Sequence, residues 1–139
     1  MTQDELARSY LAKARVRVRV LEVLAEQGAW SDVVREAQEL VELALKAMLR
    51  RIGIDPPKWH DVGPLLVEHA ALLPEVLRAD VPRLASISKW LRKEREFAFY
   101  GDVDFIPTDE YRQADADRAM DDANFVLART EAIFAAPDA

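Results

Sequence analysis

The sequence contains no cysteine, and it has only two histidines and four glycines in 139 residues. The absence of cysteine excludes a disulfide scaffold, a thiolate zinc site and a cysteine nucleophile. None of the glycines lies in a glycine-rich phosphate-binding loop. No uninterrupted apolar run approaches the roughly 18 residues that a membrane-spanning helix needs, and the first residues are acidic and polar, unlike a secretory leader. We therefore expect a cytoplasmic protein with no membrane partner.

The composition that remains is typical of a small globular protein. Hydrophobic residues make up 50% of the chain and charged residues 32%, a balance that argues against disorder. The length suits one domain, so we expect residues 1–139 to form a single domain. A high content of leucine, alanine, glutamate and arginine, with so few glycines, predicts an all-α fold.

Negative charge is concentrated in the last part of the sequence. The formal net charge is −6, yet residues 1–101 contain 16 Lys and Arg against 15 Asp and Glu. Residues 102–139 contain 3 Lys and Arg against 10 Asp and Glu. This acidic excess would repel a phosphate backbone and argues against general coating of nucleic acid. Basic groups upstream still allow a focused anion site.

Hydrophobic periodicity predicts two long helices in the first half of the chain. Apolar residues at three- and four-residue spacings indicate a helix over residues 4–27 that ends at Gly28. The alternating segment 15–20 would suggest a strand if taken alone, but its flanks are strong helix formers with no turn signal. Ser31 is the expected N-cap of the second helix, which ends at Gly53 before two prolines.

Three further helices are expected in the second half. Their predicted limits are a short helix from the cap Asp61 to about His69, a longer helix over 81–99 capped by Asp80, and a last helix from Thr108 or Asp109 through Ile133. The predicted architecture is an antiparallel bundle of four to five helices.

Several segments of the chain resemble the HEPN family of small helical-bundle domains, and together they cover most of it. They are residues 35–49, Gly53, Pro56-Pro57, His60-Asp61, Leu65-Leu66, residues 92–102, Pro107, Tyr111 and residues 114–128. The resemblance implies a homodimer with a site near the fourth helix and its following loop. It also implies two kinds of activity. Many members are paired with a minimal nucleotidyltransferase in toxin–antitoxin-like pairs, and others are metal-independent ribonucleases.

The ribonucleases of the family carry an arginine, four to six residues and then a histidine, and this sequence departs from that pattern. Its histidines, His60 and His69, both precede the fourth helix. Tyr100 occupies the place of the histidine after Arg95. Tyrosine titrates near 10 when unperturbed and is a poor proton carrier at neutral pH. The enzyme assignment therefore stays open, and a ribonuclease that lacks the usual histidine is an alternative.

The strongest candidate ligand-binding residues lie at the end of the fourth helix. Arg92 and Arg95 are three residues apart and share a helix face, where they could bind an anion or complement the helix dipole. Tyr100 is a candidate ligand stacker or a target of modification by a partner, and its alternative role is an aromatic plug at the bundle end. Lys46 is a candidate phosphate contact or an ordinary partner of Glu42.

Metal and cofactor sites are not expected. Two histidines nine positions apart, without any cysteine, provide few of the ligands that a metal site needs. Asp102 is a further candidate for ligand binding, but the residues that follow it do not have the spacing of a calcium-binding loop. From these features we predict a HEPN-type module that binds a nucleotide or another anion and works with a nucleotidyltransferase. The alternatives are the atypical ribonuclease, which would bind RNA, and a dimeric helical adaptor with no small-molecule site.

Overall fold

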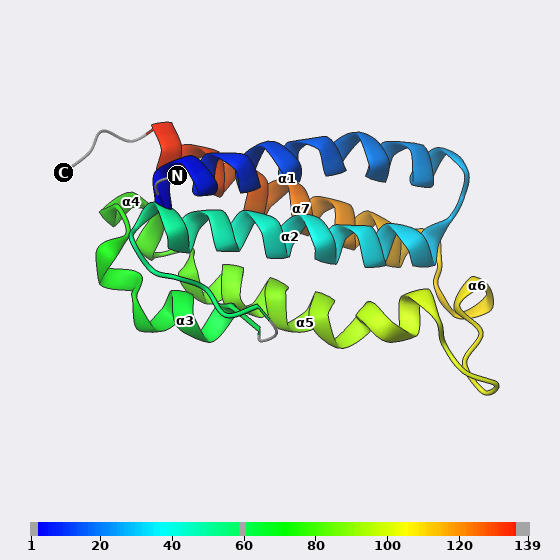
Figure 1. Cartoon of the computed structure of the whole chain (residues 1–139). Coiled ribbons are helices and arrows are strands. Elements are labelled where there is room, and N and C mark those ends of the chain that lie inside the picture. Colours follow the sequence, from blue (N-terminus) through cyan, green and yellow to red (C-terminus); the bar gives the residue numbers. More distant parts are fainter. Residues whose placement is uncertain (1–2, 59–60, 136–139) are drawn as a thin grey trace.

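The computed structural model describes residues 3–58 and 61–135, which form helices joined by short connections (Figure 1). The elements are α1 (Gln3–Glu26), α2 (Trp30–Arg51), α3 (Gly63–Glu68), the 3₁₀ turn η1 (Ala70–Leu72), α4 (Glu75–Arg78), α5 (Val81–Phe99), α6 (Pro107–Glu110) and α7 (Gln113–Ala135). No β-strand occurs in these two ranges. The predicted all-α class is confirmed.

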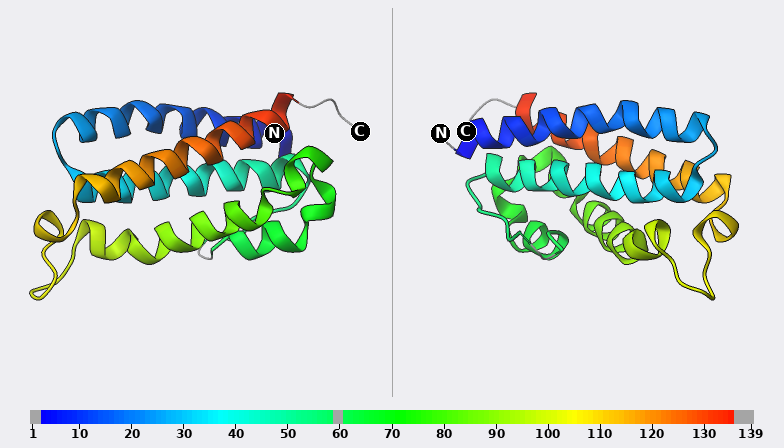
Figure 2. Two further views of the ribbon diagram at one scale, coloured as in Figure 1. Left: turned by 180° about the vertical axis from the view of Figure 1, so that it is seen from behind. Right: turned by 45° about the vertical axis from the view of Figure 1, so that its right-hand side comes forward.

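The four long helices α1, α2, α5 and α7 form an antiparallel bundle in which α2 is central. Successive long helices run in opposite directions, and α2 lies between α1 and α5 with α7 across its remaining side (Figures 1 and 2). The short elements α3, η1 and α4 lie at one end, and α6 lies at the other. None of the helices in the described part of the chain is long and apolar enough to cross a membrane.

Helix α2 holds the core together because three helices cover it. Its buried side chains are Ser31, Val33, Val34, Ala37, Gln38, Leu40, Val41, Ala44, Leu45, Ala47, Met48 and Leu49. Each large apolar side chain removed from water stabilises the fold by about 1.5–3 kcal/mol. The polar positions 35, 39, 42 and 46 recur at helical spacing and keep partial exposure on one face. This strip of α2 faces α5.

The alternating segment 15–20 is helical, as expected, and its arginines are divided between two neighbours of α1. Arg15 pairs with Glu131 of α7 at 3.4 Å, and Arg17 pairs with Glu36 of α2 at 3.3 Å. Arginines two residues apart leave a helix in different directions, so this alternation links α1 to two helices.

The expected N-caps of α2 and α5 differ in the structure. Helix α2 begins at Trp30 with Ala29 in the N-cap position, so the prediction of Ser31 as the cap was wrong; Ser31 is buried in the first turn. Asp80 does occupy the N-cap position of α5, but its carboxylate makes no capping bond and instead pairs with Arg129 of α7 at 2.9 Å. An ion pair between helices replaces the local cap.

The prediction that the last helix starts at Thr108 or Asp109 was also wrong. Those residues belong to the single-turn α6, and the chain is extended at Tyr111 before α7 begins at Gln113. The Asp115 carboxylate accepts a hydrogen bond from the Arg112 backbone N–H at 2.9 Å. This is one half of a capping box, and it fixes the start of α7 several residues later than expected.

Candidate functional site

A shallow pocket lies where the C-terminal end of α5 passes the N-terminal part of α2. Its volume is about 380 Å³, and its lining residues are Arg35, Arg92, Lys93, Arg95, Glu96, Phe97, Phe99 and Tyr100. The lining therefore combines four basic side chains, one acidic side chain and three aromatic rings. We refer to it as the α5 pocket.

Aromatic rings form one wall of the α5 pocket. Phe99 and Tyr100 meet edge to face with centroids 4.8 Å apart, and the guanidinium carbon of Arg35 lies 4.5 Å from the Phe99 centroid. Tyr100 is 74% exposed, so its ring is available to a ligand rather than closing the bundle end. A cation over a ring face is held by the ring quadrupole, which orients Arg35 in the pocket.

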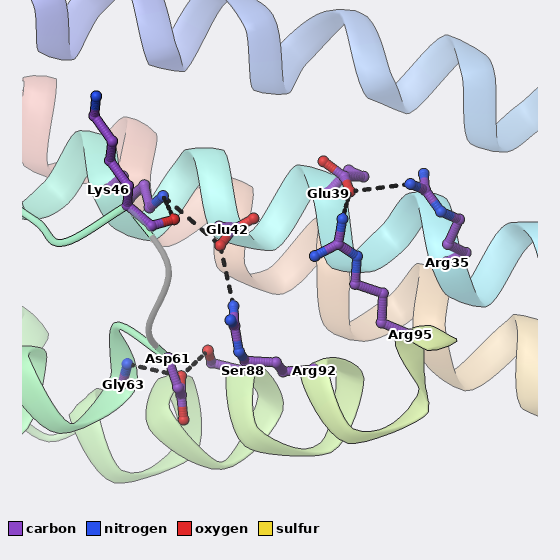
Figure 3. A network of polar contacts seen from close by, with 10 residues as sticks. Arg35, Glu39, Glu42, Lys46, Asp61, Gly63, Ser88, Arg92 and Arg95 are labelled. Atoms are coloured by element: carbon purple, nitrogen blue, oxygen red, sulfur yellow. Dashed lines mark hydrogen bonds and ion pairs between the residues drawn. The ribbon is translucent and has the colours of Figure 1, made fainter. Parts of the chain in front are cut away.

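Two carboxylates of α2 hold the basic side chains near the pocket. Oε1 of Glu39 lies 3.6 Å from Nη2 of Arg35 and 3.4 Å from Nη2 of Arg95 (Figure 3). One turn further along α2, Glu42 accepts a hydrogen bond of 3.2 Å from Arg92. The polar strip of α2 and the end of α5 are therefore joined by interhelical ion pairs.

Lys46 contributes to this network from outside the α5 pocket. Its Nζ lies 3.7 Å from Glu42 and donates a hydrogen bond of 3.4 Å to the carbonyl of Lys58. Its side chain is 14% exposed and is not part of the pocket lining. Lys46 supports the position of Glu42, and through it that of Arg92.

Asp61 ties the connection before α3 to the middle of α5. Its Oδ1 accepts hydrogen bonds from Ser88 Oγ at 2.6 Å and from the Gly63 backbone N–H at 3.0 Å (Figure 3). Val62 occupies the N-cap position of α3, so the prediction of Asp61 as the cap was wrong. Asp61 lies one residue before the N-cap and still accepts the hydrogen bond of the first helical N–H. Trp59 and the predicted family residue His60 lie outside the described residues.

The loop after α5 is a tight turn that uses the Asp102 carboxylate internally. Oδ1 of Asp102 accepts a hydrogen bond of 2.8 Å from the Asp104 backbone N–H, and the backbones of Asp102 and Phe105 are paired. Gly101 has a φ of +63°, and a Cβ atom there would collide with the Phe105 carbonyl and with Pro107. Asp102 follows the pocket residues in the chain but does not belong to the lining.

Aromatic contacts hold this loop against the bundle. Phe105 meets Phe97 at 5.4 Å and Tyr111 at 5.8 Å between ring centroids. The hydroxyl of Tyr111 donates a hydrogen bond to Glu94, and burial together with that carboxylate raises the pKa of Tyr111 above its ordinary value. Val103 and Ile106 of the same loop are exposed, whereas Phe105 packs against the core.

The matches to known proteins agree with this arrangement of helices. The family model described as the HEPN domain matches residues 7–133. This chain belongs to the HEPN family. Its fold is similar to that in the crystal structure of TT1696 from Thermus thermophilus, with 29% identity, a TM-score of 0.72 and coverage of 91% of this chain and 96% of that chain. No curated protein matches the sequence.

The structure brings three of the five predicted site residues of this HEPN domain together. Arg92, Arg95 and Tyr100 line the α5 pocket, whereas Lys46 and Asp102 lie outside it. Within residues 3–58 and 61–135 no group of three histidine or acidic residues is arranged to hold a metal ion.

Five members of the pocket were not among the predicted site residues. They are Arg35, Lys93, Glu96, Phe97 and Phe99. A usable signal existed for Arg35, because it begins the polar strip that continues at Glu39 and Glu42 on the predicted helix. The two phenylalanines gave no such signal, since exposed and core aromatics look the same in a sequence.

Proposed function

We propose that this HEPN domain is a nucleotide-binding regulatory module. The observation that carries the proposal is the α5 pocket, which places guanidinium groups beside exposed aromatic rings. Arginine forks bind phosphate oxygens through paired N–H donors, and we assign this role to Arg35, Arg92 and Arg95. A base can stack on an aromatic face, and we assign this role to Phe99 and Tyr100.

The proposed partner is a minimal nucleotidyltransferase in a toxin–antitoxin-like pair. The exposure of Tyr100 supports this, because a hydroxyl on a side chain that is 74% exposed can enter the active site of a second protein. The proposed assembly is a homodimer. Val103 and Ile106, which are 93% and 50% exposed in the loop after α5, support it because pairing of two copies would cover apolar surface.

Titration with AMP tests the nucleotide-binding proposal. We expect saturable binding by calorimetry, and Arg95→Ala should weaken it by roughly tenfold because a charge-assisted contact is removed. Arg8→Ala is the matched control, since Arg8 is an exposed α1 arginine that pairs with Asp4 at 3.0 Å and does not line the α5 pocket. Binding that survives unchanged in Arg95→Ala would contradict the proposal.

Incubation with mixed RNA and EDTA tests the ribonuclease alternative. We expect intact RNA with both the wild type and Arg95→Ala. Cleavage that disappears in Arg95→Ala, with an unchanged circular dichroism spectrum, would instead make the protein a ribonuclease that lacks the usual histidine. A protein that neither binds AMP nor cleaves RNA would fit the adaptor alternative.

A further inference from the structure

Glu39 is the one α2 carboxylate paired with both Arg35 and Arg95 of the α5 pocket in the described part of the chain. Its Oε1 reaches the two side chains at 3.6 and 3.4 Å. The same two arginines belong to the pocket lining, whereas Glu39 does not. A negative group of the protein therefore already occupies the position between two cations that an incoming phosphate would need.

The two ion pairs leave room for exchange. Their N···O distances are those of ion pairs rather than short hydrogen bonds, and the side chains of Arg35, Glu39 and Arg95 are 27%, 28% and 43% exposed. Partly exposed pairs of this kind contribute little net stability, because water screens them. Arg35 is also held over Phe99, so it stays in the pocket when its carboxylate partner is displaced.

We propose that Glu39 acts as an internal competitor that makes the α5 pocket selective for terminal phosphates, an inference that rests on the nucleotide-binding function proposed above. A phosphate monoester carries a charge of about −1.5 to −2 near pH 7 and three acceptor oxygens, so it exceeds a carboxylate in both respects. A phosphodiester carries a single charge and has fewer free oxygens, so it gains little over Glu39. The occupant is then a mononucleotide or a phosphorylated end, not the interior of an RNA strand.

Removal of the Glu39 charge tests this selectivity. The probes are AMP, 3′,5′-cyclic AMP and adenosine, which share the base and differ in the phosphate. The wild type should bind AMP and show no measurable affinity for cyclic AMP. Glu39→Gln should bind AMP roughly tenfold more tightly and bind cyclic AMP measurably, because both arginines are released from their internal partner. Adenosine affinity should be the same in both proteins.

Two variants separate the charge from a merely structural role. Glu39→Asp keeps the charge and should, like the wild type, show no measurable affinity for cyclic AMP, and Glu39→Ala should repeat the gain of Glu39→Gln. Glu131→Gln is the control: Glu131 of α7 pairs with Arg15 at 3.4 Å, and both residues lie outside the pocket lining. It should leave the affinity for all three probes unchanged.

The outcomes distinguish this inference from the proposal on which it rests. If AMP binds through Arg95 but Glu39→Gln binds it no more tightly, the inference on Glu39 is wrong and the nucleotide-binding function stands. If neither protein binds AMP, the nucleotide-binding function is wrong and the inference falls with it. Measurable cyclic AMP binding by the wild type would also overturn the selectivity.

Discussion

The hydroxyl of Tyr111 lies 2.7 Å from Oε2 of Glu94, and this hydrogen bond joins the segment before α7 to the last turns of α5. Tyr111 is only 7% exposed, and its hydrogen bond to Glu94 is partly buried. The contact closes the loop that carries Gly101 and Asp102 and thereby places that loop beside the pocket.

Replacement of Tyr111 by phenylalanine should destabilise the fold. The ring contact with Phe105 is kept, but Glu94 loses a hydrogen bond, and such a loss costs about 1–3 kcal/mol. Urea unfolding monitored by circular dichroism measures it. Tyr100→Phe is the control, because Tyr100 is 74% exposed and water can replace its partners. Equal stability of wild type and Tyr111→Phe would show that the hydrogen bond does not hold the loop.

Gly101→Ala should destabilise the fold more than Gly53→Ala does. Its φ of +63° is unfavourable for alanine, and its Cβ would collide with the Phe105 carbonyl, so we expect a loss of about 2–4 kcal/mol. Gly53 has a φ of +86° with no atom within 4 Å of an added Cβ. Gly53→Ala should therefore cost only about 1–2 kcal/mol. Thermal unfolding of both variants compares them, and equal losses would mean that the collision is relieved by movement of the loop.

Stability should depend on pH through Asp122 of α7. Burial raises the pKa of Asp122, although Arg118 and Arg83 act in the opposite direction. The folded state therefore binds a proton at Asp122 more tightly than the unfolded state does. The charged carboxylate lowers the stability of the fold above the raised pKa, and this destabilisation is lost as the pH falls through that pKa.

The variant Asp122→Asn should therefore gain stability relative to the wild type at pH 7, and this gain should shrink at pH 4. Denaturant unfolding of both proteins at the two pH values measures the difference. A difference in the free energy of unfolding between the two proteins that does not change with pH would contradict the raised pKa.

Arg35→Ala should weaken AMP binding as strongly as Arg95→Ala, although sequence patterns did not select Arg35. The substitution removes both a pocket cation and the contact with the Phe99 ring at 4.5 Å. Arg83→Ala is the matched control, because Arg83 lies over Phe125 at 3.7 Å, outside the pocket lining. Calorimetry reports the affinities. An Arg35→Ala protein that binds AMP like the wild type would remove Arg35 from the proposed site.

Much of the fold could be predicted from the sequence because long amphipathic helices have a strong periodic signal. The glycine that ends the first helix, Gly28, and the limits of α5 were predicted within one residue of the structure. The break between α6 and α7 was missed because it depends on the Asp115 cap and on the burial of Tyr111, which are tertiary features.

The site could be predicted only in part, for a similar reason. Arg92 and Arg95 share a face of one predicted helix, so their proximity followed from helical spacing. The approach of Arg35 to the same place depends on how α2 lies against α5, which no local pattern specifies. The use of Asp102 in a turn, rather than toward a ligand, was likewise decided by the loop geometry.

The central position of α2 has a consequence for the motions of the pocket. The backbone amides of a helix covered by three others exchange their hydrogens last, because local unfolding there costs the most free energy. The end of a helix that is followed by a loop unfolds locally more readily. Arg35 and Glu39 belong to that slowly opening helix, while Tyr100 directly follows the end of α5. A ligand would therefore meet charged groups whose positions are set in advance on one side, and an aromatic edge that can adjust to its shape on the other.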